Sequence, residues 1–277
     1  MSNLQPKISV IMPFYNAQRF LAKAIESILN QTFSDFELIL INDASTDNSD
    51  QIVKKYLADS RIVYIKNEKN QGIVANLNLG LKSAKAEIIA RMDGDDVALA
   101  KRFEEQFRFL LENKDVAVVG SYVKIIDEFD KEIDYRTKPI DTKEIEKNLI
   151  TYSPLVHPST MFRKSVVLQV GAYRPEYLYL EDIDLWYRIV YLGYKISNVS
   201  QYLLSYRYHG NSTAHQGKIN AIKAFKLRKE TIKKFKLKLK FSQKFSIYLQ
   251  LIVGVVFSGR QRQALEGLYK KLFYHGK

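Results

Sequence analysis

The 277-residue chain contains no cysteine and no long hydrophobic run, and each absence removes a class of structure or chemistry. Without cysteine there are no disulfides, no thiolate metal ligands and no cysteine nucleophile, which suits a reducing compartment. The longest nearly apolar run, residues 247–257, is interrupted by Gln250 and is about half the ~20 residues that a membrane-spanning helix needs. The start of the chain, MSNLQPK, has no basic segment followed by an apolar one. We therefore expect no transmembrane helix and no signal peptide.

Acidic residues are nearly missing from one part of the chain, residues 218–244. This segment holds eleven Lys or Arg and a single acid, Glu230, so it carries +10 of the net charge of +13. The rest of the chain is close to neutral, and the basic segment is a distinct object. Its lysines interleave with apolar residues in a pattern that mostly fits an amphipathic helix. Such a helix binds anionic membrane surfaces, or it packs on the rest of the protein with its lysines in solvent; both remain open.

The remaining chain alternates apolar strand-like runs with helical patterns. The expected strands cover residues 8–14, 36–41, 61–66, 87–92, 116–126 and 195–206, and the expected helices cover 17–29, 49–57, 72–83, 99–113 and 181–192. Residues 127–143 are expected as a polar excursion, and 155–162 as partly extended. This alternation predicts a mostly parallel α/β sheet covered on both faces. Ligands bind such sheets at the carboxyl ends of the strands.

Three carboxylates, Asp93, Asp95 and Asp96, follow the fourth expected strand. Acids this close repel one another, so burying them is costly unless a cation compensates. Residues i and i+2 of an extended segment point to the same side, and Gly94 permits a tight backbone between them. Oxygen ligands of this kind suit Mg2+ or Mn2+. A solvated acidic turn is the alternative for this motif alone, but polar residues also follow the first two expected strands.

Seven motifs occur along the chain, in the order SVIMPFYN, INDASTDNS, NQG, MDGDD, HPSTMFR, EDIDLW and YRYHGNS. Together they resemble the inverting nucleotide-sugar glycosyltransferases of family 2, over residues 6–215. The resemblance implies the GT-A fold, a Rossmann-like, mostly parallel sheet flanked by helices, here followed by a helical basic C-terminal extension. It implies a nucleotide-sugar-binding half at 1–97, an acceptor-binding and catalytic half at 98–215, and the extension at 216–277.

The resemblance assigns the donor nucleotide to the ends of the first two strands. Asp43 matches the family's nucleotide-recognition aspartate, which accepts a hydrogen bond from a base N–H. Pro13, Tyr15 and Asn16 would line the same pocket. The alternatives are a helix-capping turn at Asp43 and a plain strand-to-helix turn after Pro13.

The MDGDD motif matches the family's metal site. Asp93 and Asp95, with Gly94 between them, match the DxD pair, in which one acid contacts the ribose or a metal-bound water and the other binds Mn2+ or Mg2+ bridging the phosphates. Asp96 extends this cluster as a third metal ligand. His209 matches a histidine that completes the metal or phosphate contacts, and a surface-loop histidine is the alternative.

The EDIDLW motif matches the catalytic position of the family. Asp182 is expected as the general base that deprotonates the acceptor hydroxyl, with Asp184 as the fallback and Glu181 beside it as an acceptor or leaving-group contact. Acids favoured by a helix dipole are the alternative. Trp186 is expected either as a wall of the acceptor site or as core, and His157 either as a site residue or as a buried loop residue.

The sequence departs from the family pattern at one position, where it lacks an arginine side chain. After N-x-G many relatives carry Ala-Arg-Asn, with the Arg facing the nucleotide, whereas residues 76–78 here read Asn-Leu-Asn. The diphosphate charge would then be met by the metal, by helix N-terminal N–H groups or by Arg91, Arg163 or Lys164. Arg163 is therefore also expected as an acceptor or leaving-group contact.

The sequence thus predicts a metal-dependent inverting glycosyltransferase that moves a sugar from a nucleoside diphosphate sugar to a saccharide acceptor, in surface polysaccharide synthesis of the O-antigen or capsule type. A UDP-sugar is favoured because Asp43 suits a pyrimidine with an N–H. The acceptor is expected to be lipid-linked, and the location cytoplasmic and peripheral at the inner face of the plasma membrane. Nucleic acid is not an expected partner. A nucleotidyltransferase would show a Gly- and Arg-rich loop after the first strand, and a nucleic-acid binder would leave the acids unexplained.

Overall fold

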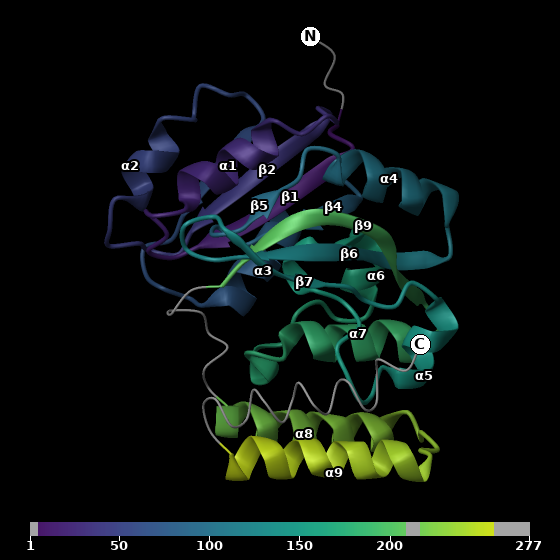
Figure 1. Ribbon diagram of the computed structural model, residues 1–277. Coiled ribbons are helices and arrows are strands. Elements are labelled where there is room, and N and C mark those ends of the chain that lie inside the picture. The colour runs from purple at the N-terminus through teal and green to yellow at the C-terminus, as the bar shows by residue number, and fades with distance from the viewer. Residues whose placement is uncertain (1–4, 209–216, 258–277) are drawn as a thin grey trace. The chain divides into compact units, whose positions relative to one another are not determined.

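The computed structural model describes residues 5–208 and 217–257 (Figure 1). It divides into two compact units, which are described separately. The first comprises residues 1–147 and 153–210, and the second comprises residues 148–152 and 211–277. The predicted division of the first unit at residue 97 stays a prediction.

The first unit is built on a nine-stranded sheet with the order β3-β2-β1-β4-β8-β6-β9-β5, and β7 pairs with β6. The strands are β1 (Ile8–Phe14), β2 (Phe36–Asn42), β3 (Ile62–Lys66), β4 (Ile88–Arg91), β5 (Val97–Ala98), β6 (Val116–Ile126), β7 (Glu132–Arg136), β8 (Met161–Arg163) and β9 (Lys195–Arg207). Strands β3, β2, β1 and β4 pair in parallel, and β6 pairs in parallel with β9. The predicted mixed α/β sheet is therefore present.

Helices cover both faces of the β1 region, which explains why β1 is apolar at nearly every position. Successive side chains of a strand point to opposite faces. Met12 belongs to the core under α1 (Leu21–Leu29) and α4 (Arg102–Glu112). Ile11 points to the other face, where a Cβ on Gly80 of α3 (Ile73–Ser83) would lie 2.4 Å from its side chain.

Helix α1 is amphipathic but starts four residues later than its periodicity suggested. Its buried residues recur at helical spacing, at Leu21, Ala24, Ile25 and Ile28. The backbone N–H groups of residues 16–18 instead donate to side chains in the segment after β2, at Ser45, Ser49 and Asp47. These side-chain acceptors hold residues 15–20 as a turn.

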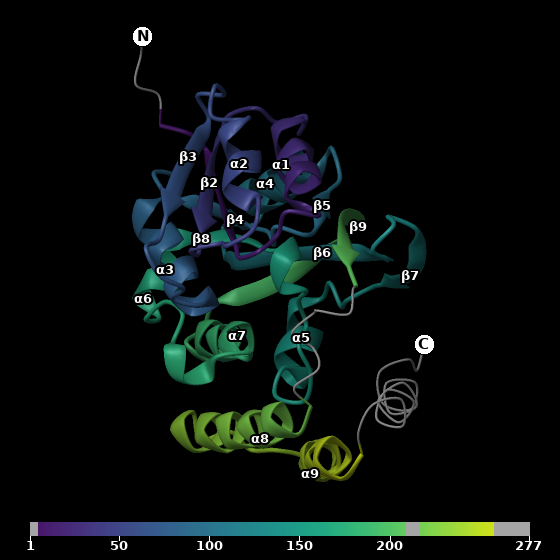
Figure 2. The same cartoon turned by 90° about the vertical axis from the view of Figure 1, so that its left-hand side faces the viewer.

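The second half of the first unit contains elements that the sequence pattern did not reveal. Strand β7 falls in the expected polar excursion; its sequence, EIDYR, alternates polar and apolar residues, but all five residues are exposed. Residues 157–159 form a 3-10 turn, and only β8 after it is extended. Figure 2 shows β6 and β9 beside each other, as their parallel pairing requires. The other helices of this unit are α2 (Ser49–Lys54), α5 (Thr142–Asn148), α6 (Lys164–Gln169) and α7 (Glu181–Tyr191), with a second 3-10 turn at Pro175–Tyr177.

The second unit contains α8 (Gly217–Lys234) and α9 (Phe241–Val256), which lie side by side in Figures 1 and 2. A Cβ on Gly254 would lie 2.3 Å from that of Ala221, so the glycine allows the helices to approach closely. Gln250 accepts a hydrogen bond from Arg228 and donates one to the Thr151 carbonyl. Among the described helices, none combines the length and the apolar content needed to cross a bilayer.

Candidate active site

The parallel pairing of β2, β1 and β4 brings three polar segments to one edge of the sheet. Phe14 lies opposite Asn42 and Ile11 opposite Arg91, so the residues that follow each strand emerge at the same edge. The Asp43 N–H donates to the Phe14 carbonyl at 2.9 Å. A Cβ on Gly94 would lie 2.9 Å from the Phe14 Cβ, which shows that the acidic loop passes close to the end of β1. Only glycine permits this approach without displacement.

Asp43 is buried at this edge and held by hydrogen bonds. Its Oδ1 accepts from the Gln71 N–H and the Asn67 Nδ2, each at 2.8 Å, and its Oδ2 accepts from the Gly72 N–H at 2.9 Å. Burial raises the pKa of Asp43, but these hydrogen bonds outweigh it and leave the pKa lowered. The carboxylate therefore stays charged and holds the Gln71–Gly72 turn that precedes α3, although α2 is nearer to it in sequence. Oδ2 keeps capacity for a further donor.

The predicted nucleotide-site residues at the end of β1 and directly after it differ in what they offer to a ligand. Pro13 is buried inside the strand, opposite Ile41. Asn16 has a φ of 50°, and its Oδ1 accepts from the Thr46 N–H at 2.8 Å, so it joins two loops. The Tyr15 side chain is 49% exposed. Its ring is therefore the available flat surface at this edge.

The acidic cluster after β4 is compact. Asp93, Asp95 and Asp96 each offer a ligand oxygen within 4.8 Å of the others. Two guanidinium nitrogens of Arg91 pair with the two oxygens of Asp93, at 2.8 and 2.6 Å. Burial, followed by the charges of neighbouring aspartates, raises the pKa of Asp96 well above its usual range.

One oxygen of Asp96 has no hydrogen-bond partner among the described residues, and this indicates a place for a cation. Its Oδ1 accepts from the Arg207 N–H at 2.8 Å, whereas its Oδ2 is buried without a hydrogen-bond partner in the parts of the chain that the structure describes. A buried carboxylate oxygen beside two further carboxylates is costly unless a cation compensates it. The donors are all hard oxygens, so the residues present fit a divalent cation such as Mg2+ or Mn2+.

Arg207, at the end of β9, was not predicted as a site residue. Its side chain is buried, donates from Nε to the Asp95 carbonyl at 2.7 Å and pairs with Asp130 at 2.6 Å. Its guanidinium carbon lies 4.4 Å from the centroid of the Phe20 ring. It therefore fixes the backbone of the acidic loop. The signals in the sequence were its place directly after a predicted strand and its place in the YRYHGNS motif.

The start of α7 presents Glu181 and Asp182. Glu181 is 9% exposed and its Oε2 has no partner among the described residues. Burial, followed by the charge of Asp182, raises its pKa to about 7. Asp182 is half-buried, and burial raises its pKa as well. The positive charge of Arg91 opposes the rise in the pKa of Glu181, of Asp182 and of Asp93. The start of α7 and the end of β4 therefore share one electrostatic environment.

Asp184 differs from Asp182 although both lie in the first turn of α7. It is 1% exposed and pairs with Arg174 and with Arg188, the latter at 2.8 Å. Arg188 also donates to the carbonyls of Val170 and Ala172. Both Asp184 oxygens accept hydrogen bonds from these guanidinium groups, which leaves no room for an acceptor hydroxyl. The geometry therefore does not support Asp184 as the fallback base.

His157 and Trp186 lie in the interior. His157 is 8% exposed and its Nε2 lies 2.9 Å from the Tyr173 hydroxyl. Burial, together with Arg91, lowers its pKa well below the usual range, so the ring is neutral. The Trp186 ring meets the His157 ring edge to face at 5.9 Å and is fully buried, with its indole N–H lacking a partner within the described residues.

Two of the predicted site residues are not brought to the cluster. Arg163 lies opposite Ile88 because β8 runs antiparallel to β4, so it stands at the start of β4 instead of the end. Its guanidinium donates to the carbonyls of Leu110 and Val116, at 2.7 and 3.1 Å. The structure therefore does not support Arg163 as a leaving-group or acceptor contact. Lys164 is at the same end and donates to the Ala84 carbonyl. His209 lies outside the described residues.

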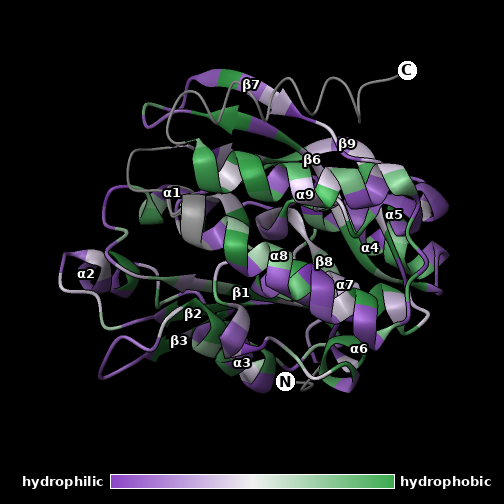
Figure 3. Cartoon of the chain, turned by 90° about the horizontal axis from the view of Figure 1, so that it is seen from below, coloured by the Kyte–Doolittle hydropathy of each residue, from purple (hydrophilic) through white to green (hydrophobic). Residues whose placement is uncertain are grey.

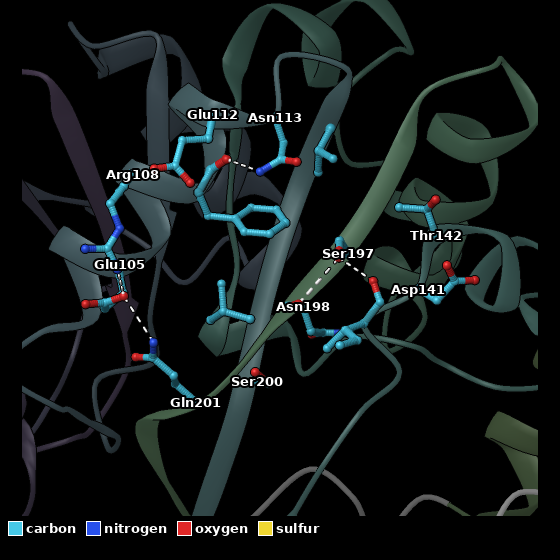
Figure 4. Close-up of a pocket in the computed structure, with 14 residues that line it drawn as sticks. Glu105, Arg108, Glu112, Asn113, Asp141, Thr142, Ser197, Asn198, Ser200 and Gln201 are labelled. Atoms are coloured by element: carbon cyan, nitrogen blue, oxygen red, sulfur yellow. Dashed lines mark hydrogen bonds and ion pairs between the residues drawn. The ribbon is translucent and has the colours of Figure 1, made fainter.

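A pocket of about 520 Å³ opens elsewhere in the first unit, between α4, α5 and the start of β9 (Figure 4). Glu105 on its wall pairs with Arg108 and accepts from Gln201. Ser197, on β9, donates to the Ile140 carbonyl. Arg207 lies at the other end of β9, so this pocket is at the opposite edge of the sheet from the acidic cluster. It is lined by none of the predicted site residues.

Comparison with known proteins gives a consistent result. A family model described as glycosyl transferase family 2 matches residues 9–171. The O-antigen biosynthesis glycosyltransferase WbnJ of Escherichia coli is 38% identical over 213 residues, which cover 74% of this chain and 81% of that protein. The UDP-Gal:alpha-D-GlcNAc-diphosphoundecaprenol beta-1,3-galactosyltransferase of Escherichia coli is 33% identical over 227 residues, covering 79% and 80%.

Two solved structures share the fold. TarS of S. aureus, residues 1–349 in complex with UDP-GlcNAc, superposes with a TM-score of 0.65 at 20% identity, covering 94% of this chain and 83% of that one. The mannosyltransferase PcManGT of Pyrobaculum calidifontis, in complex with GDP-Man and Mn2+, gives 0.64 at 15% identity, covering 99% and 82%. The predicted GT-A fold is thereby confirmed, whereas the role of the basic C-terminal extension stays a prediction.

Proposed function

The chain belongs to glycosyl transferase family 2 and is a glycosyltransferase, and from this premise we propose that it transfers a sugar from a UDP-sugar to a saccharide acceptor with inversion. The observation that carries the proposal is the unpartnered, buried Oδ2 of Asp96 among three carboxylates, at the sheet edge that also holds Asp43. A cation site beside a nucleotide site is what a nucleoside diphosphate sugar requires.

The donor nucleotide is assigned to the ends of β1 and β2. Asp43 is charged and rigid, and its Oδ2 can accept a hydrogen bond from a base N–H. Tyr15 offers its exposed ring to the flat base, while Pro13 and Asn16 shape the turn. The galactosyltransferase relative is named for UDP-Gal and TarS was solved with UDP-GlcNAc, which favours UDP; PcManGT with GDP-Man keeps GDP as the alternative.

Asp93, Asp95 and Asp96 would hold a divalent cation, Mn2+ or Mg2+, with His209 as a further predicted ligand. When bound, such an ion neutralises charge that develops on the departing diphosphate. Arg91 holds Asp93 in place through two hydrogen bonds and is itself a buried cation near the acids of α7. It is therefore our candidate for part of the role of the arginine missing at residues 76–78.

Asp182 is proposed as the general base. Its carboxylate takes the proton from the acceptor hydroxyl as that oxygen forms a bond to the anomeric carbon. The bond from this carbon to the diphosphate breaks at the same time, and the diphosphate leaves with the electron pair. Attack from the face opposite the leaving group inverts the anomeric centre. A raised pKa makes Asp182 a stronger base than an exposed aspartate. Glu181 is assigned to the acceptor side, whereas the fully buried Trp186 takes the core role that was its alternative.

The acceptor is proposed to be a lipid-linked saccharide, in the synthesis of a surface polysaccharide. This rests on the relatives, one named for O-antigen biosynthesis and one for a diphosphoundecaprenol acceptor. A lipid-linked acceptor places the enzyme at the inner face of the plasma membrane, as a peripheral protein.

Titration calorimetry of UDP tests the donor site, with Mn2+ and after chelation. We expect binding that depends on the metal and is lost in Asp95→Ala. Asp115→Ala is the matched control, because it removes an exposed aspartate at the start of β6 that pairs with Lys195, and it should bind as wild type does. Absence of binding to UDP, GDP and dTDP under every condition would overturn the proposal.

A further inference from the structure

Helix α9 carries an exposed apolar stripe that the proposed reaction does not use. Five of its side chains are half or more exposed, with values of 84% for Phe241, 50% for Phe245, 56% for Tyr248, 52% for Ile252 and 67% for Val256. They are separated by three or four residues, so they share one face of the helix. In Figure 3 hydrophobic green recurs along α9, whereas α8 shows more hydrophilic purple.

The stripe differs from the buried face of α9, although Tyr248 at its border also contacts α8, with its ring centroid 5.3 Å from that of Phe225. Ser246, Ile247 and Gly254 are the buried residues of the helix, and Gly254 approaches Ala221 of α8. Packing against α8 therefore explains the buried face of α9 and the position of Tyr248, and it leaves the other four exposed side chains of the stripe unexplained. Three aromatic and two aliphatic side chains in solvent form an apolar surface that monomeric proteins seldom leave uncovered.

Exposed lysines gather where α8 ends and α9 begins. They are Lys233, Lys234, Lys236, Lys238, Lys240 and Lys244. None of the six has an ion pair with an acid in the described parts of the chain. Lys240 and Lys244 lie at the N-terminal end of α9, where the helix dipole favours acids over cations. Stability of the fold therefore does not account for this charge.

We propose that the Phe241–Val256 stripe, with these six lysines at one end, docks on an anionic lipid bilayer. The charge complements acidic headgroups, and the aromatic and aliphatic side chains suit the boundary between headgroups and acyl chains. At 16 residues α9 is too short to span but long enough to lie in that boundary. A nucleic acid would use the lysines but not the stripe. The proposal deepens the proposed function, since a lipid-linked acceptor requires the enzyme at a membrane.

Flotation of the full chain with vesicles tests this directly. Wild type should float with phosphatidylcholine vesicles containing phosphatidylglycerol, float poorly with phosphatidylcholine alone, and be released by salt. The triple variant Lys236→Gln/Lys238→Gln/Lys240→Gln should weaken binding on the order of 100-fold, since each lysine near the surface contributes about fivefold. Lys55→Gln/Lys114→Gln/Lys143→Gln removes the same charge from exposed sites of the first unit and should float as wild type does.

The apolar contact has its own readout. Phe245→Trp should show a blue-shifted emission and quenching by brominated lipids when anionic vesicles are added, whereas Leu192→Trp, at an exposed site in the first unit, should show neither. Phe241→Ser/Phe245→Ser should bind on the order of tenfold more weakly without loss of salt sensitivity.

Three results would overturn the docking proposal. They are equal flotation of both triple lysine variants, an unshifted Phe245→Trp spectrum on vesicles, and a wild-type dimer that Phe241→Ser/Phe245→Ser converts to a monomer, which would assign the stripe to a second copy. UDP calorimetry on the same variants separates the two proposals. Normal metal-dependent UDP binding with no vesicle binding rejects the docking surface alone.

Discussion

Two regions of this protein handle charge in opposite ways. At the acidic edge, formed by Asp93, Asp95, Asp96, Glu181 and Asp182, charges are buried or half-buried, and Arg91 and Arg207 lie against them. In the loop and helix ends around Lys233–Lys244, charges of one sign are exposed and unpaired with any described acid. Burial makes each charge depend on specific neighbours, whereas exposed charges act collectively and are screened by salt. Single substitutions should therefore matter at the first region and matter little at the second.

The largest effect is expected at Asp182. Asp182→Asn removes the proton acceptor, so kcat should fall about 10²- to 10⁴-fold while UDP affinity stays unchanged. Steady-state kinetics and UDP calorimetry measure the two quantities. The wild-type kcat/KM should also decline on acidification through a pKa above the usual aspartate range. A variant with wild-type kcat would remove Asp182 from the mechanism.

Asp184, two residues away, should instead affect stability. Asp184→Asn leaves the Arg174 and Arg188 guanidinium groups without their carboxylate, at a site that is 1% exposed. The free energy of unfolding should fall by about 3–5 kcal/mol, measured by urea denaturation. The folded fraction should keep its kcat. Normal stability combined with a large loss of kcat would exchange the roles assigned to the two aspartates.

Glu181 should show a pH-dependent effect on stability. Its pKa is raised to about 7 in the folded state, so the folded state binds more protons than the unfolded one between its ordinary pKa and 7. The contribution of Glu181 to stability therefore falls as pH rises through this window. Glu181→Gln should be more stable than wild type at pH 8, by on the order of 3 kcal/mol, and similar at pH 4. Equal stabilities at pH 8 would mean that Glu181 is solvated.

The smallest effect is expected for one lysine of the second region. Lys238→Gln removes an exposed charge that forms no ion pair with a described acid. The urea midpoint should therefore not change, and UDP binding should be normal. Vesicle binding should weaken only about fivefold. A marked loss of stability from this single change would show that the lysines are structural, and the contrast between the two regions would fail.

Much of the first unit was predictable because its pattern is local. Strands at 8–14 and 116–126 were predicted with their observed bounds, since apolar runs bounded by polar residues define a buried strand. Strand β7 was missed because it has no apolar run, and its two alternating apolar residues stand within a long polar segment. The positions of Asp43 and of the acidic cluster at one edge followed from strands running in parallel.

Arg163 shows where local pattern fails. Its strand was expected, but the direction of that strand relative to β4 cannot be read from a short run of residues. The antiparallel pairing puts Arg163 opposite Ile88, at the end of the sheet away from the acids. Arg207 shows the reverse, because an arginine at a strand end became a support of the acidic loop only when β9 paired with β5, the strand that follows this loop.

The sequence by itself determined the fold class, the family and the residue types at the site, because apolar periodicity and motif order are properties of neighbouring residues. It also determined the uneven charge. The tertiary structure alone decided which of two nearby acids is held by arginines. Asp184 meets Arg174 across a turn and Arg188 one helical turn on, whereas Asp182 does not, and such pairing depends on contacts between residues brought together by folding.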